Sequence, residues 1–324
     1  MASDRHAMTA YFKENQVDLI NHSRRDVFGK LWTHYFSLVP FAPKLIEDFK
    51  KRGDEWIEDH VAYRTLPGEH TGAHILQAVF EALGYKRMDD YNFEEKQLKA
   101  FWMCPPDIEA HSREASPKIF ISELIPTKFT PEFQEIVRRY TSQVSASPLP
   151  RIKALREKLK TGDQEAAAEF VAECAGLLTA LPAWNRPSLK DYEILRKESE
   201  YAAWTALFGQ QINHFTVSVH LMKTFKDIHP LVEFLDQDLK VPMNTSGGGI
   251  VKGSPDLLLE QISTMAVEVK YNFQDGQMSV PYGFVEFAYR YPLAGKKHDG
   301  VWSSYYQGFV TSNADKIFES TTRS

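Results

Sequence analysis

The chain has 324 residues, 43% of them hydrophobic, so it is long enough to bury a full core in one large or two smaller domains. Its 38 basic and 43 acidic residues give a net charge of −5, and no basic stripe marks a nucleic-acid-binding surface. No apolar run reaches the roughly 18 residues that a membrane span requires. We therefore expect a folded protein with neither a nucleic-acid nor a membrane partner.

The two cysteines, Cys104 and Cys174, lie far apart and form no CxxC pair. This spacing disfavours both a disulfide framework and a cysteine zinc site. The opening residues 1–15 contain neither an apolar signal core nor the arginine-rich, acid-poor character of a transit peptide. We expect a cytoplasmic location.

The first part of the chain predicts a helical segment followed by a module of strands and one helix. Residues 7–53 have helical periodicity, which Pro40 interrupts. The next predicted elements are a strand at 59–66, a helix at 72–83, and strands at 98–104 and 118–124. We assign residues 1–53 to a helical lead-in and residues 54–130 to a first module.

The middle of the chain changes character, and then the earlier order of elements returns. Residues 131–211 are rich in Ala, Leu, Glu and Lys and predict a helical insertion. The elements predicted after it are a strand at 212–220, a helix at 224–235, and strands at 265–273 and 282–290. Residues 212–324 therefore predict a second copy of the module. The expected fold is one compact α+β domain in which two modules pair their sheets around a shared pocket.

Four polar residues in these strands are the candidate functional residues. The strand period of two places His60 and Arg64 on one face of the first strand, and it places His214 and Glu286 on the polar faces of two later strands. Two imidazoles and one carboxylate that line one cavity are the donor set of a non-haem Fe(II) site, which leaves three coordination positions open for substrate and O₂.

The residues alone leave alternatives open. A buried Glu286 requires a metal or an arginine partner, and Arg290 or Arg64 would serve as that partner. Arg64 is suited to hold a carboxylate through two hydrogen bonds, but an inter-strand ion pair is its alternative role. Glu123, near the end of the strand predicted at 118–124, would give a fourth metal ligand. A four-ligand site leaves two open positions and suits an isomerase.

Three sequence runs resemble the 2-oxoadipate dioxygenase/decarboxylase family, which has the vicinal-oxygen-chelate, or glyoxalase-like, superfold. They are HVAYR, NHFTV and the late FVEFAYR. The resemblance covers nearly the whole chain and implies two βαβββ modules around a metal-centred cavity. It also implies that His60, His214 and Glu286 are metal ligands, and that Arg64 is the catalytic residue that binds a substrate carboxylate.

The resemblance further implies an Fe(II)-dependent dioxygenase that decarboxylates a 2-oxo acid. The expected reaction converts 2-oxoadipate to 2-hydroxyglutarate and CO₂ in lysine breakdown, with the oxo acid and O₂ as partners and no separate 2-oxoglutarate. The alternatives are a glyoxalase-like four-ligand isomerase or lyase, and a non-catalytic module that binds a metal or a small molecule. Longer family members continue well past the third ligand strand, and substrate contacts from that extra segment are expected to be missing here.

Overall fold

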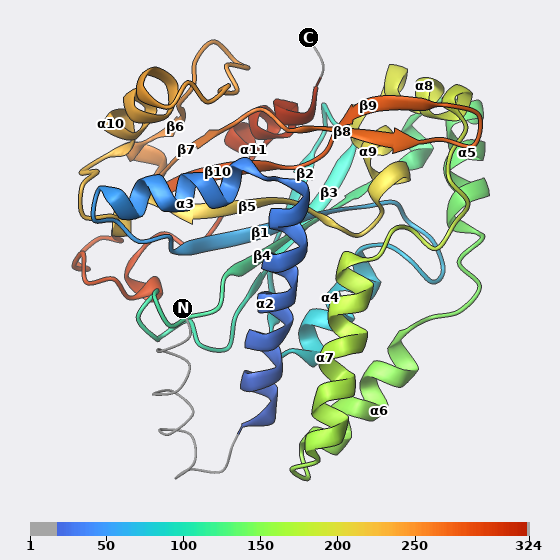
Figure 1. Cartoon of the computed structure of the whole chain (residues 1–324), viewed down its shortest axis with the longest axis horizontal. Coiled ribbons are helices and arrows are strands. Elements are labelled where there is room, and N and C mark those ends of the chain that lie inside the picture. Colours follow the sequence, from blue (N-terminus) through green and yellow to red (C-terminus); the bar gives the residue numbers. More distant parts are fainter. Residues whose placement is uncertain (1–17, 323–324) are drawn as a thin grey trace.

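An eight-stranded mixed sheet is the central element of the computed structural model, which describes residues 18–322 (Figure 1). The strand order is β2-β3-β4-β1-β5-β10-β7-β6. Its strands are β1 (Glu58–Thr65), β2 (Lys86–Phe93), β3 (Leu98–Cys104), β4 (Lys118–Leu124), β5 (Ile212–Ser218), β6 (Lys252–Ser254), β7 (Leu259–Ser263) and β10 (Phe284–Arg290). A separate two-stranded sheet contains β8 (Glu268–Asn272) and β9 (Gln277–Pro281).

The large sheet consists of two halves with the same arrangement. The first strand of each half pairs in parallel with the last strand, β1 with β4 and β5 with β10. The two first strands, β1 and β5, pair antiparallel at the centre and join the halves. Each half has the order βαβββ, and the β8–β9 hairpin is inserted in the second. The predicted α+β fold with two related modules is confirmed.

The helices surround this sheet. They are α2 (Leu19–Leu38), α3 (Phe41–Lys51), α4 (Ala73–Ala82), α5 (Pro131–Thr141), α6 (Leu149–Leu159), α7 (Gln164–Thr179), α8 (Leu189–Glu198), α9 (Glu200–Phe208), α10 (Ile228–Glu233) and α11 (Thr311–Ile317). Helices α5 to α9 form the helical segment predicted between the modules, and in Figure 1 α6 and α7 extend away from the sheet beside α2. Residues 7–17 of the predicted lead-in lie outside the described residues, and the division of the chain into four segments stays a prediction.

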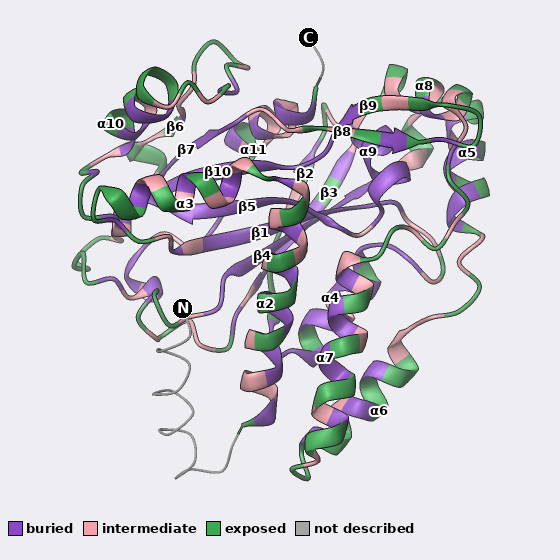
Figure 2. Ribbon diagram, in the orientation of Figure 1, coloured by how far each residue is buried: buried purple, intermediate pink, exposed green. Residues whose placement is uncertain are grey.

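Helices α2 and α3 cover the apolar face of the sheet, and Figure 1 shows them in blue in front of the central strands. Trp32 of α2 stacks on Phe215 of β5 with ring centroids 3.5 Å apart, and Phe49 of α3 meets Phe287 of β10 edge to face at 5.9 Å. Such rings bury large apolar areas and fix the strands against the helices. The central strands are buried in Figure 2. The opposite sheet face is thereby left for polar residues.

The strands β2, β6, β7 and β9 were not predicted from the sequence. The strand predicted at 265–273 is present as β8, but it pairs with β9 in the small hairpin. The strand that pairs antiparallel with β10 is β7, which the sequence did not locate. Strand β7 was missed because it has the sequence LEQIS, in which polar residues occupy buried positions. Edge strand β2 was also not located from the sequence, because it is largely exposed and has no apolar alternation.

Candidate metal centre

His60, His214 and Glu286 meet on one face of the sheet, from β1, β5 and β10. Thr216 lies opposite both His60 and Glu286 in the strand register, and Ala62 lies opposite His214. One potential ligand atom from each of the three residues lies within 4.8 Å of the other two. His214 Nε2 is 3.1 Å and His60 Nε2 is 3.7 Å from a Glu286 carboxylate oxygen. We call these three residues the His-His-Glu group.

The His-His-Glu group is enclosed by the protein, with 2%, 5% and 1% of His60, His214 and Glu286 exposed. Burial lowers the pKa of His214, which favours the neutral imidazole that binds metals. Burial alone would raise the pKa of Glu286, but the nearby His60 and His214 outweigh it, and this pKa lies below its ordinary value. Glu286 is therefore an anion at neutral pH.

This donor set fits a divalent metal ion. Nitrogen and oxygen ligands about 2.0–2.2 Å from one ion lie at most about 4.4 Å apart, so small side-chain adjustments bring the group to a ligand geometry. Gln261 Nε2 also donates a 2.6 Å hydrogen bond to Glu286 Oε1, which restrains the carboxylate. A buried anion beside imidazole nitrogens is a stable arrangement when a cation joins it.

Arg64 lies further along β1 and has no carboxylate within ion-pair distance among the residues that the structure describes. Its guanidinium donates to Thr321 Oγ1 at 3.0 Å and to the Phe318 carbonyl at 3.3 Å, and it lies over the rings of Tyr201 and Trp204, each 5.3 Å away. Burial lowers its pKa to about 10, so it remains a cation at neutral pH. Its Nε has no hydrogen-bond partner in the described part of the chain. The inter-strand ion pair that the sequence left open for Arg64 is therefore not found within residues 18–322.

Arg290, the other arginine considered as a partner of Glu286, is held by Asp59 instead. Its Nε and Nη2 donate to the two Asp59 oxygens at 2.7 and 2.8 Å. Burial alone would raise the pKa of Asp59, but Arg290 and Lys118 keep it well below its ordinary value. Lys118 lies opposite His60 in the β1–β4 register, and its Nζ is 3.4 Å from the centre of the Trp302 ring. Burial lowers the pKa of Lys118 to about 7.

Glu123 is not part of the His-His-Glu group. Its Oε2 accepts a 2.7 Å hydrogen bond from the Ala73 backbone N–H at the start of α4, and its Oε1 lies 3.0 Å from Lys99 Nζ. A Cβ on Gly72 would approach Glu123 Oε2 to 2.6 Å, and Gly72 has a φ of +109°, so only glycine fits this close contact. Both carboxylate oxygens of Glu123 are engaged at the end of a helix.

The C-terminal segment, residues 306–322, covers the polar face of the sheet. The Phe309 ring lies edge-on to His60 with centroids 4.8 Å apart, and Phe318 lies beside Arg64. The backbone carbonyls of Tyr306 and Gly308 accept hydrogen bonds from Arg290 Nη1. None of these contacts was predicted, because nothing local in the sequence of this segment indicates which strand it will meet.

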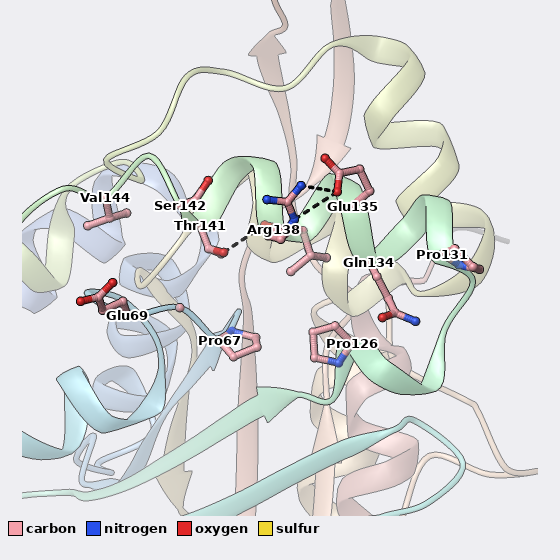
Figure 3. A pocket seen from close by; sticks show the side chains of 12 residues that line it. Pro67, Glu69, Pro126, Pro131, Gln134, Glu135, Arg138, Thr141, Ser142 and Val144 are labelled. Carbon is pink, nitrogen blue, oxygen red and sulfur yellow. Dashed lines mark hydrogen bonds and ion pairs between the residues drawn. The ribbon is translucent and has the colours of Figure 1, made fainter.

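A surface pocket of about 620 Å³ lies elsewhere, at the ends of β1 and β4 (Figure 3). Its lining includes Pro67, Pro126 and residues of α5, and none of the His-His-Glu group. The Glu135–Arg138 ion pair drawn in Figure 3 is exposed and joins residues one helical turn apart. Such a pair contributes little energy, and this pocket has no buried charge comparable to Arg64.

Comparisons with known proteins agree with this description. The sequence model of the 2-oxoadipate dioxygenase/decarboxylase family matches residues 42–304. A chloroplastic 2-oxoadipate dioxygenase/decarboxylase of Arabidopsis thaliana is 34% identical over 311 residues, which cover 92% of this chain and 77% of that protein. A relative from Oryza sativa subsp. japonica, named for the chloroplast or amyloplast, is 33% identical over 309 residues, with 92% and 78% covered.

Solved structures of similar fold include a hydroxyglutarate synthase and a glyoxalase superfamily protein. A hydroxyglutarate synthase from Oryza sativa, crystallised in complex with 2-oxoadipate, has a TM-score of 0.76 and 32% identity, with 94% of this chain and 93% of that chain covered. A glyoxalase superfamily protein from Ralstonia eutropha JMP134 has a TM-score of 0.70 and 25% identity, with 86% and 83% covered. Within the described residues, no helix is long and apolar enough to cross a membrane. The cytoplasmic location stays a prediction. The matched family model and the similarity over nearly the full length show that this chain belongs to the 2-oxoadipate dioxygenase/decarboxylase family.

Proposed function

We propose that this protein is an Fe(II)-dependent dioxygenase that decarboxylates a 2-oxo acid. The proposed reaction is 2-oxoadipate plus O₂ to 2-hydroxyglutarate plus CO₂, as a step of lysine breakdown. Carbon, hydrogen and oxygen balance in this reaction without a further co-substrate. The related rice enzyme was crystallised with 2-oxoadipate, which supports this choice of substrate.

The observation that carries the proposal is the buried Arg64 beside the His-His-Glu group. A buried cation without a counter-ion is costly, and an anionic ligand would remove that cost. The planar guanidinium is suited to grip a carboxylate through two parallel hydrogen bonds. We propose that a substrate carboxylate takes the place of the Thr321 hydroxyl and the Phe318 carbonyl as the partner of Arg64.

The spacing along β1 supports a substrate with two carboxylates. Arg64 lies two residues beyond Ala62, which is opposite His214, so it is displaced by roughly 6–7 Å along the strand from the level of His214. A carboxylate at Arg64 is therefore several carbon atoms away from groups held at His214. A six-carbon 2-oxo diacid has this length, and the small Ala62 side chain leaves room for its carbon chain.

The chain's own residues would bind, orient and enclose the substrate. His60, His214 and Glu286 would hold the ferrous ion, which supplies the redox chemistry that O₂ requires. Arg64 would fix the position of the acid, and this contributes to the rate through orientation. The aromatic residues of the C-terminal segment exclude water from the site. The engagement of Glu123 at α4 favours this three-ligand site over the four-ligand isomerase.

The proposal is tested by loading the protein with Fe(II) under anaerobic conditions and then measuring O₂ uptake and CO₂ release with C4 to C6 oxo acids. We expect one O₂ consumed and one CO₂ released per 2-oxoadipate, with 2-hydroxyglutarate as the product. His214→Ala provides the matched inactive control. Stoichiometric metal binding without O₂ uptake on any acid would overturn the dioxygenase and favour the metal-binding module.

A further inference from the structure

We propose that Asp59 and Asn213 are a matched pair of positioning residues, one in each module, which hold His60 and His214 with their Nε2 atoms directed into the metal centre. The inference rests on the proposed function, since it assumes that the His-His-Glu group binds a metal ion. It assigns a role to two residues outside the His-His-Glu group. The supporting observations are two irregularities in the pairing of β1 with β5.

The first irregularity is at Asp59. Glu58 lies opposite Val217, and the next pair joins His60 to Thr216. Asp59 is thus the additional residue of a β-bulge. In a regular strand, neighbouring residues point to opposite faces, but a bulge re-aims a side chain. The Asp59 carboxylate consequently reaches the ring of His60, the residue that follows it.

The second irregularity is at Asn213, on the partner strand. Ala62 lies opposite His214, and the next pair joins Tyr63 to Ile212. Asn213 is therefore also an additional residue, at the equivalent position immediately before the histidine of the second module. Both halves of the sheet therefore have the same feature, an Asx-His pair at a bulge in the first strand of the half.

Both Asx side chains contact the histidine nitrogen that faces away from Glu286. Asp59 Oδ1 is 2.8 Å from His60 Nδ1, and Asn213 Oδ1 is 3.1 Å from His214 Nδ1. An ionised carboxylate and an amide oxygen only accept hydrogen bonds, so each Nδ1 carries the proton. Each Nε2 then carries a lone pair and no proton, which is the form that binds a metal. The His60 lone pair accepts a 3.0 Å hydrogen bond from the Thr216 hydroxyl, whose place a metal ion would take.

Asp59 and Asn213 differ in charge, and only the charged Asp59 has a buried counter-charge beside it. Asp59 is an anion balanced by the buried Arg290, which is itself anchored by carbonyls of the C-terminal segment. Asn213 is neutral, and its Nδ2 has no hydrogen-bond partner within residues 18–322. An aspartate at 213 would therefore keep the acceptor for His214, whereas a leucine would keep the volume and lose it.

The test is a titration of metal-free protein with Co(II), followed by its d–d absorption and by calorimetry. We expect Asn213→Leu to lose about 10- to 100-fold in Co(II) affinity with an altered d–d band, and Asn213→Asp to retain most of the affinity. Ser218→Ala, which truncates another buried polar residue of β5, is the control and should bind like the wild type. Unfolding curves of the metal-free variants show whether each one is folded.

The outcomes separate this inference from the proposed function. Wild-type protein that binds no Co(II) would overturn the metal centre and the inference together. Wild-type binding with equal affinity in folded Asn213→Leu would overturn the positioning role alone. Should Asn213→Leu not fold, a ten-fold or larger loss in Asn213→Ser with retention in Asn213→Asp supports the role, and equal binding by all three proteins counts against it.

Discussion

Asp59 and Arg290 form a two-point ion pair across 231 residues of sequence, with both side chains completely buried. The pair joins β1 of the first module to the end of β10 in the second. The pair also contacts His60, because the same Asp59 carboxylate lies 2.8 Å from His60 Nδ1, the ring nitrogen that faces away from Glu286. The stability of the protein and the geometry of the candidate metal centre therefore depend on one carboxylate.

Breaking this pair is expected to destabilise the metal-free protein. Asp59→Asn should lower the free energy of unfolding by about 3–5 kcal/mol, because it leaves the Arg290 cation buried without its counter-ion. Arg290→Met removes that cation, so the double variant should be less destabilised than the sum of the two single variants. Denaturant unfolding of all four proteins measures this coupling, and simple additivity would show that the two side chains do not interact.

Replacement of Arg64 should separate metal binding from turnover. Arg64→Lys is expected to retain metal affinity and to lower kcat/KM for 2-oxoadipate by about 100-fold, because an ammonium group is unable to reproduce a two-point grip on a carboxylate. Arg87→Lys is a matched control, since the Arg87 guanidinium also lies over an aromatic ring but at the exposed edge of the sheet. Normal turnover by Arg64→Lys on every oxo acid would contradict the role of Arg64 and show that the substrate carboxylate binds to another residue.

Glu123 should affect stability and leave the metal centre unchanged. Glu123→Gln is expected to lower the free energy of unfolding by about 1 kcal/mol, because the charged acceptor at the first turn of α4 is lost. Co(II) affinity should equal that of the wild type. A clear loss of metal from this variant would instead indicate a four-ligand site and an isomerase.

The buried Lys118 should make stability depend on pH. Its pKa is about 7 in the folded protein and near its ordinary value of 10.5 when unfolded, so the unfolded chain binds more protons between these values. Stability therefore rises with pH in this window, by about 2 kcal/mol between pH 7 and pH 9. Lys118→Met removes the titrating group. The difference in unfolding free energy between wild type and variant should shrink as the pH rises, and a constant difference would contradict this assignment.

The fold class and the residues of the candidate site could be predicted from the sequence, because the positions of these residues follow the local periodicity of a strand. The period of two in a strand is visible without tertiary structure, and it placed His60, His214 and Glu286 on polar faces. The partners that complete the site obey no such rule. Asp59 reaches His60 only because a bulge breaks the period, and Thr321 reaches Arg64 from a distant part of the chain. The repeated Asx-His pairs were present in the sequence, and they are the one local signal that would have indicated the first of these contacts.

The position of the His-His-Glu group across the junction of the two modules would link metal supply to the lifetime of the protein. His60 belongs to the first module, whereas His214 and Glu286 belong to the second, so an ion held there would cross-link the halves. A ligand that binds only the folded state stabilises it by about 4 kcal/mol at a thousand times its Kd. A cell short of that metal would then contain less of the protein as well as a less active one, because unfolded chains are open to proteolysis.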